Sequence, residues 1–158
     1  MALTTNHITH RKPKGGKEKS VSNMAPAREI HGREVTERFE RGLKTRREVL
    51  GGAYVDASVS KATDFNWPMQ TLVTEYCWDA IWNRPGLERK QRSILNLGMI
   101  SALNRPHELK LHVRGAINNG LTKEEIREVF LQVSIYCGVP AAIDSFRVAA
   151  EVFDEMGI

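Results

Sequence analysis

Hydrophobic residues recur at spacings of three and four along most of the chain, which is the period of an amphipathic helix. The first run covers residues 35–50 and stops at Gly51-Gly52, a pair that ends helices. A second helix is predicted to begin near Pro68, because apolar side chains keep the helical spacing from there to Pro85. Each of these helices would bury one apolar face against the rest of the molecule.

The third predicted helix, residues 87–103, has apolar side chains on nearly all sides, so we expect it to be deeply buried. The next begins at Pro106, since proline is favoured in a first helical turn, and runs to Asn118. The Asn119-Gly120 pair that follows is a C-terminal signal, because glycine readily takes the positive φ that ends many helices.

The last two helices are marked by signals at their N-termini. Thr122 and Glu125 form a capping box, in which each side chain binds the free backbone N–H of the other residue. Pro140 opens the final helix, which extends to about Glu155. No useful run of alternating apolar and polar residues indicates a strand. The sequence therefore predicts an all-α protein, a single-domain bundle of about six helices.

Length and composition narrow the class of protein further. A chain of 158 residues fits one domain. It has no run of 18 apolar residues that could span a membrane and no apolar stretch near its start that would mark a secretory signal. Its two cysteines, Cys77 and Cys137, belong to no CxxC motif, which argues against a disulfide framework and a zinc module. We therefore expect a cytoplasmic protein without a membrane partner.

The net charge of +4 and the pI near 9.2 suggest at first a nucleic-acid-binding protein. The charge is unevenly distributed, however: residues 1–30 hold six basic and two acidic residues, and residues 31–158 hold 17 of each. We interpret residues 1–30 as a disordered basic tail, because they contain too few apolar residues to form a core, and residues 31–158 as the folded domain. The tail is also a candidate targeting or nucleic-acid-binding arm, and Met24 a candidate start of translation. For the domain we expect no nucleic-acid partner.

Glu108 and His112 are the residues whose spacing most clearly suggests chemistry. They lie one helical turn apart, within about 40° of each other, at the edge of an apolar stripe. A carboxylate one turn from an imidazole can fix its tautomer and raise its basicity, which suits proton transfer near neutral pH. Arg105, one turn earlier, can hold an anionic group. The same pair is also common on solvated helix faces, so a purely structural role stays open.

A metal site is not expected, because no HExxH-type spacing is present and Glu108, His112 and His107 would need a further ligand.

The order and spacing of several segments resemble those of the carboxymuconolactone decarboxylase family. The resemblance covers about residues 36–156, and its motifs are Arg84-Pro85-Gly86-Leu87, Asn104-Arg105 with His107-Glu108-Leu109, Leu111-His112-Val113-Arg114, Asn118-Asn119-Gly120 and Tyr136-Cys137-Gly138-Val139-Pro140-Ala141-Ala142. It implies an all-α fold that needs no cofactor and assembles as homo-trimers or homo-hexamers. It also implies decarboxylation of γ-carboxymuconolactone to β-ketoadipate enol-lactone in protocatechuate catabolism.

The same superfamily contains alkylhydroperoxidase D-like proteins, whose signature is a CxxC motif with a histidine four residues after the second cysteine. His112 matches that histidine, but Glu108 and Arg105 stand in the two cysteine positions. A dithiol peroxidase needs neighbouring thiols for attack and resolution, so this activity is disfavoured.

The resemblance implies a small anionic lactone as substrate and suggests a role for each candidate residue. His112 would act as general acid, and Glu108 would orient it. Arg105 and His107 are candidates for binding a carboxylate or the lactone oxyanion, and Arg84 and Arg89 for further anion contacts that could reach a neighbouring subunit's site. Two alternatives stay open: the same fold acting on another lactone, a keto acid or a polyketide-like substrate, and a non-catalytic helical oligomer that acts through its basic tail.

Overall fold

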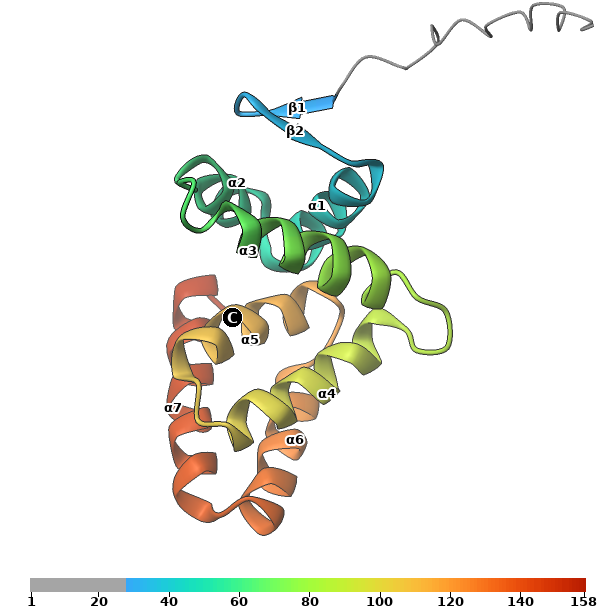
Figure 1. The fold of residues 1–158 in the computed structure, drawn as a ribbon. Helices are drawn as coiled ribbons and strands as arrows, with labels where there is room; N and C mark the ends of the chain where they lie inside the picture. The colour runs from blue at the N-terminus through green and yellow to red at the C-terminus, as the bar shows by residue number, and fades with distance from the viewer. Residues whose placement is uncertain (1–27) are drawn as a thin grey trace, which may run out of the picture.

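The structure is a computed structural model that describes residues 28–158, and these fold into an N-terminal and a C-terminal group of helices (Figure 1). Residues 1–27, for which the sequence predicts a disordered tail, lie outside the described residues. Arg28–Ile30 was expected to belong to that tail but forms strand β1. The fold class is all-α, as predicted.

The N-terminal group begins with a short hairpin that the sequence pattern did not reveal. Strand β1 pairs with β2 (Arg33–Val35) in antiparallel register, and each strand is only three residues long. The two turn residues, His31 and Gly32, both have positive φ, which is typical of a tight hairpin turn. Strands this short show no alternation that could be recognised in a sequence.

The helices of the N-terminal group pack around one hydrophobic cluster. They are α1 (Glu37–Leu50), α2 (Gly52–Ser60), α3 (Trp67–Leu72) and the π-helix η1 (Val73–Ile81). The cluster consists of Phe39, Leu43, Val49, Leu50, Val55, Val59, Trp78 and Trp82. Helix α2 was not predicted, and the single helix expected from Pro68 is an α-helix continued by a π-helix. Hydropathy patterns do not distinguish the π-helix from an α-helix, because the difference lies in the backbone hydrogen bonds.

The C-terminal group forms a second core. Its helices are α4 (Arg89–Ala102), α5 (Pro106–Asn118), α6 (Lys123–Tyr136) and α7 (Val139–Met156). The capping box of α6 is present as predicted, since Thr122 N–H donates to Glu125 and Glu125 N–H donates to Thr122. The core consists of Leu97, Leu109, Val113, Ala116, Leu121, Ile126, Phe130, Ala149 and Val152.

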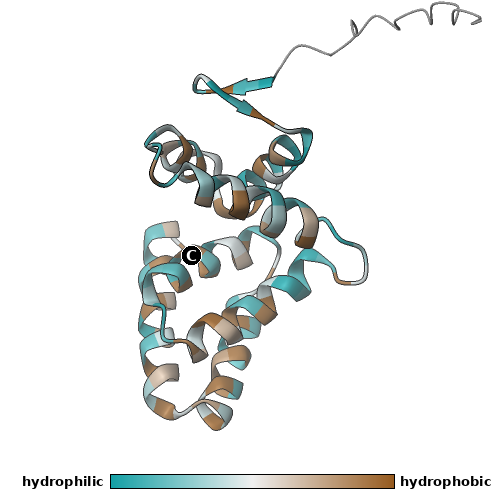
Figure 2. Ribbon diagram, in the orientation of Figure 1, coloured by the Kyte–Doolittle hydropathy of each residue, from teal (hydrophilic) through white to brown (hydrophobic). Residues whose placement is uncertain are grey.

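The prediction that residues 87–103 form a deeply buried helix is wrong. Only Ser93, Leu97 and Ser101 of α4 are buried. Leu95 and Met99 are exposed because the neighbouring helices α5, α6 and α7 leave another face of α4 uncovered. Figure 2 shows hydrophobic segments along α4, α6 and α7.

The two groups meet where α5 crosses the end of α1. A Cβ atom added at Gly115 would lie 3.0 Å from Val49 Cγ1, so the absence of a side chain favours this close approach. Asn118 strengthens the contact by donating a side-chain hydrogen bond to the Val49 carbonyl at 2.8 Å. This junction holds one face of α5 against the N-terminal group. Among residues 28–158, no helix is long and apolar enough to cross a membrane.

Candidate active site

His112 lies where α5 faces the π-helix, and its imidazole stacks on two tryptophans. Its ring is 6.3 Å from that of Trp78 and 6.5 Å from that of Trp82, with interplanar angles of 6° and 24°. The two indoles stack on each other at 5.0 Å. We call Trp78 and Trp82 the indole platform. Both are almost fully buried, so the imidazole meets a flat apolar surface.

The position of His112 follows from the two faces of α5. Leu109 and Val113 are buried in the C-terminal core. Leu111 packs on the N-terminal core. His112 is half-buried on the same helix, and the indole platform comes from η1 (Trp78) and from the residue that caps its C-terminus (Trp82). π-helical turns occur frequently at functional sites, where the extra residue per turn redirects side chains.

Burial determines the charge of His112. It lowers the pKa of the imidazole to about 4, and the negative charge of Glu108 opposes this effect without overcoming it. At neutral pH the imidazole is therefore uncharged in the free protein. Glu108 itself is exposed and acts on His112 through its charge. A general acid must carry its proton, so a bound anion would have to raise this pKa again before His112 could donate.

The structure places Arg105 and His107 at the start of α5, away from the imidazole. Arg105 precedes the helix, and the seven positions from it to His112 correspond to about 10 Å along the axis. Arg105 borders a small crevice with Asp144 and Ser145 of α7. His107 is exposed in the first turn of α5. These two residues are not part of the stack around His112.

Arg84 lies in the loop that connects η1 to α4, and Arg89 is the first residue of α4. The carbonyl of Arg84 accepts a hydrogen bond from Arg92 at 2.7 Å. Arg89 forms an ion pair with Glu48 at 2.7 Å. Arg89 also borders a polar hollow of about 290 Å³, whose other lining residues are Arg41, Lys44, Thr45, Glu48 and Asn83. The structure brings Glu108 and His112 together, but it does not bring the four other candidates to them.

Sequence reasoning missed the surroundings of His112. Tryptophans four residues apart, such as Trp78 and Trp82, are more often core or interface residues. Nothing in their own segment indicates that these two contact a histidine from α5. Arg46 was also missed. It is only 7% exposed, although it stands next to the exposed Arg47. Its spacing from Leu43 and Leu50 places it on the buried face of α1, and this spacing is the signal that could have identified it.

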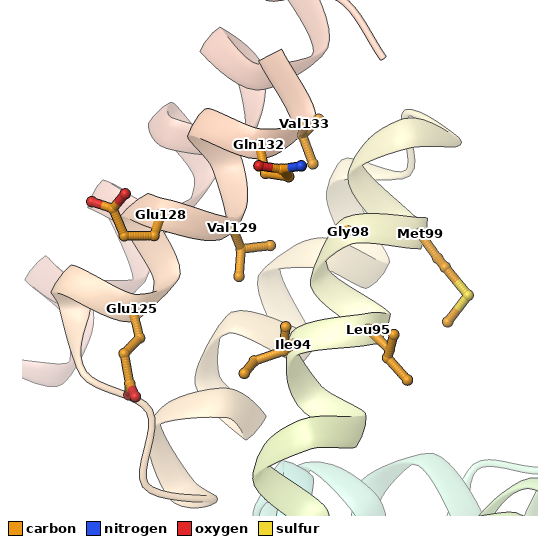
Figure 3. Close-up of a pocket in the computed structure, with 9 residues that line it drawn as sticks. All are labelled: Ile94, Leu95, Gly98, Met99, Glu125, Glu128, Val129, Gln132 and Val133. Carbon is orange, nitrogen blue, oxygen red and sulfur yellow. The ribbon is translucent and has the colours of Figure 1, made fainter. Parts of the chain in front are cut away.

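A groove of about 610 Å³ lies between α4 and α6, away from the indole platform (Figure 3). Ile94 and Val129 point into it from opposite sides, and Leu95 and Met99 line its α4 side. Glu125 at its edge is already held by Lys90 and by the capping box. With an almost wholly apolar lining, this groove suits a protein contact better than proton transfer.

No group of three or more His, Cys, Asp or Glu residues that could hold a metal ion occurs within residues 28–158.

Comparison with known proteins places the chain in a family. The family model of the carboxymuconolactone decarboxylase family matches residues 68–151. Nitrosuccinic acid decarboxylase of Metarhizium robertsii is 45% identical over 136 residues, which are 86% of this chain and 92% of that protein. The 4-carboxymuconolactone decarboxylase of Acinetobacter baylyi is 40% identical over 122 residues, which are 77% of this chain and 91% of that protein. The chain belongs to the carboxymuconolactone decarboxylase family, and its enzyme class is that of a carboxy-lyase.

Proposed function

We propose that this enzyme decarboxylates a small dicarboxylic acid that carries its own electron sink, with γ-carboxymuconolactone as the first candidate substrate. The product would be β-ketoadipate enol-lactone, an intermediate of protocatechuate catabolism. The observation that most supports this proposal is the uncharged imidazole of His112, held on the apolar indole platform with the carboxylate of Glu108 one turn away.

The chemistry of the lactone explains why no cofactor is required. Its γ-carbon carries the departing carboxylate and a CH2–COO⁻ arm, and it lies next to a C=C bond conjugated with the lactone carbonyl. When CO2 leaves, the electron pair moves through the C=C bond into the carbonyl and forms a dienolate. Protonation next to that carbonyl then gives the isomeric enol-lactone. The substrate therefore supplies the electron sink, and the protein must bind a dianion and deliver one proton.

The surroundings of His112 favour loss of CO2 and delivery of the proton. The apolar indole platform would desolvate the departing carboxylate, which favours its conversion to neutral CO2. The two negative charges of the substrate would raise the pKa of His112, so the imidazole takes up a proton when the substrate binds. His112 then donates this proton to the dienolate carbon, and the charge of Glu108 stabilises the imidazolium before transfer.

Nitrosuccinate is a second candidate, favoured by the 45% identity to a relative named for that substrate. Loss of the carboxylate on the carbon that bears the nitro group would leave a nitronate. Protonation of that carbon would give 3-nitropropanoate. Nitrosuccinate and γ-carboxymuconolactone share a succinate core, in which one carbon bears the departing carboxylate, the electron sink and a CH2–COO⁻ arm. The same side chains could therefore serve either reaction.

We also propose that the enzyme works as a homo-oligomer, a trimer or a hexamer. The exposed apolar side chains on α4, α6 and α7 support this assembly, because soluble monomers rarely expose so large an apolar surface. In such an assembly the exposed Arg84, Arg105 and His107 and the half-buried Arg89 would be available to contact the substrate of a neighbouring subunit.

Parallel assays on one preparation test the function. Decarboxylation of the lactone is followed by ultraviolet absorbance and that of nitrosuccinate by CO2 release, with the full chain and with a chain starting at Met24. We expect turnover of at least one substrate by both chains, and the ratio of kcat/KM values identifies the preferred one. Absence of turnover with both substrates would refute the proposal. Binding of nucleic acid by the full chain alone would then support the non-catalytic alternative.

A further inference from the structure

Arg46 is a buried guanidinium without a carboxylate partner among residues 28–158. It donates hydrogen bonds to Gln70 Oε1 at 2.8 Å and to Ser58 Oγ at 3.4 Å, both of which are neutral acceptors. Its Nε atom is buried and has no acceptor in this described part of the chain. The side chain connects α1, α2 and α3, but its positive charge is not compensated there.

The neighbouring arginines of α1 show that this arrangement is unusual within the helix. Arg41 holds Asp79 at 2.9 Å, and Arg47 holds Asp56 at 2.6 Å. Both of these arginines are exposed, so their charges need compensation least. Burying an unpaired charge is strongly unfavourable, and buried charges in proteins are therefore normally paired. Arg46 is thus the arginine of this helix that most needs an anion and has none.

The free edge of the guanidinium is suited to a carboxylate. Nε and Nη2 point along the same edge, where two parallel N–H donors can bind both oxygens of one carboxylate. On this edge Nε has no acceptor, and Nη2 has only the long contact with Ser58. The stronger bond, to Gln70, is made by Nη1 and would remain in place.

Cys77 connects Arg46 with the surroundings of His112. The thiol of Cys77 lies close enough to Arg46 for each group to affect the pKa of the other. Trp82 of the indole platform lies beside the same thiol. Cys77 has exposed surface, although its neighbours desolvate the thiol enough to raise its pKa. A small anion that displaced the side chains enclosing Nε on the side of Cys77 would therefore lie between the buried guanidinium and the platform on which His112 stacks.

We propose that Arg46 binds the carboxylate that the substrate keeps, in a carboxylate subsite formed by Arg46, Ser58 and Cys77. This assignment rests on the proposed function, because it names the group that holds the CH2–COO⁻ arm. The departing carboxylate must lose its charge when CO2 forms, so an arginine bound to it would stabilise the ground state more than the transition state. The retained carboxylate keeps its charge throughout the reaction and can stay on Arg46 at no cost to the rate.

The test uses succinate, the core shared by both candidate substrates, and propionate, which lacks the second carboxylate. Succinate should inhibit turnover competitively and bind the resting enzyme in calorimetry, and propionate should bind much more weakly. Arg46→Gln should raise KM and the succinate dissociation constant by about 10- to 100-fold while changing kcat little, because the lost charged hydrogen bonds act equally on ground and transition states. For Arg46→Lys, KM and the succinate dissociation constant should lie between those of the unmodified enzyme and of Arg46→Gln, since lysine keeps the charge but loses the paired donors.

Arg47→Gln is the matched control, because it removes the adjacent exposed arginine and should leave KM and succinate binding unchanged. Unchanged KM and succinate binding in Arg46→Gln would overturn the proposal, and so would equal effects of the two glutamine variants. If either of these results is found and the unmodified enzyme turns over its substrate, the proposed function remains intact. Succinate binding that depends on Arg46, without turnover of either substrate, would support the subsite and refute the function.

A measurement on the unmodified protein covers the case in which Arg46→Gln does not fold. Succinate should slow alkylation of Cys77 by iodoacetamide, and the exposed Cys137 serves as the internal control. Unchanged alkylation of Cys77 at saturating succinate would contradict the proposal. A Cys77 thiol that never reacts would also contradict it, because the proposed route to Arg46 passes this residue.

Discussion

His112 carries the chemistry proposed for this enzyme, and its environment determines what it can do. Burial against the indole platform favours the uncharged imidazole, and Glu108 opposes this effect only in part. The proton would be bound only when a dianionic substrate occupies the site, which couples substrate binding to proton uptake.

Replacement of His112 by asparagine should lower kcat by about 10²- to 10⁴-fold, the usual contribution of a general acid. The variant should keep the helical circular dichroism spectrum and the oligomeric state of the parent, because α5 is held mainly by Leu109, Val113 and Gly115. His31→Asn is the matched control, since His31 is exposed in the hairpin turn and asparagine tolerates its positive φ. Near-normal turnover in a folded His112→Asn enzyme would exclude the assigned role.

The lowered pKa of His112 also predicts how stability depends on pH. The unfolded chain binds a proton at His112 below about pH 6.5, but the folded protein binds it only near pH 4. The free energy of unfolding should therefore fall as the pH falls from 6.5 towards 4, by up to about 3 kcal/mol from this residue. Above pH 6.5 the residue should contribute no pH dependence.

Urea unfolding at several pH values checks this prediction when the parent is compared with His112→Asn. The difference in unfolding free energy between the two proteins should change through the window from pH 6.5 to 4. A difference that stays constant across this window would show that His112 is not held neutral by the fold.

At the scale of helices, the contact between α1 and η1 positions the indole platform. A Cβ atom added at Gly42 of α1 would lie 1.9 Å from the carbonyl oxygen of Thr74 in η1. Two side-chain hydrogen bonds from Arg41 to Asp79, at 2.9 and 3.1 Å, hold the same two helices together. The backbones of these helices therefore touch, and the orientation of Trp78 and Trp82 depends on this contact.

Gly42→Ala should lower the free energy of unfolding by about 2–4 kcal/mol, because backbone atoms must move to accommodate the methyl group. Gly52→Ala is the control, since a Cβ atom at Gly52 would meet nothing within 4 Å and should change stability by less than about 1 kcal/mol. Chemical denaturation measures both. Equal stability of the two variants would mean that α1 and η1 do not touch as described.

Elements with strong local signals were predicted well. Helix α5 has the predicted bounds, Pro106–Asn118, and α6 follows its capping box. The hairpin at residues 28–35 and helix α2 were missed because they are short and have weak patterns. Of the candidate site, the pairing of Glu108 with His112 could be predicted from their spacing in one helix. The platform could not, because Trp78 and Trp82 lie in another element.

At the level of the whole molecule, the exposed apolar surface is the feature that a lone chain does not explain. Ile135 and Tyr136 at the end of α6 are each 78% exposed, and Met99 beside the α4–α6 groove is 54% exposed. Helix α4 is apolar on several faces, but its own chain covers only one of them. We propose that a second copy of the chain covers the remaining apolar faces of α4.

Met99→Glu should therefore dissociate the oligomer, because a carboxylate would be buried in an apolar contact. Size-exclusion chromatography with light scattering should show the parent as a trimer or hexamer and the variant as a smaller species. Ala57→Glu on α2 introduces the same charge at an exposed position and should leave the mass unchanged. A parent that elutes as a monomer would contradict the proposed assembly.

The sequence by itself determined the all-α class, most helix bounds, the family and the i, i+4 spacing of Glu108 and His112. These properties depend on interactions within a few residues, so local patterns encode them. Only the tertiary structure decided that His112 is uncharged, that Arg46 is buried without a carboxylate, and that α4 has an uncovered face. Charge state, pairing and exposure depend on which distant segments surround a side chain, and these segments come together only after folding.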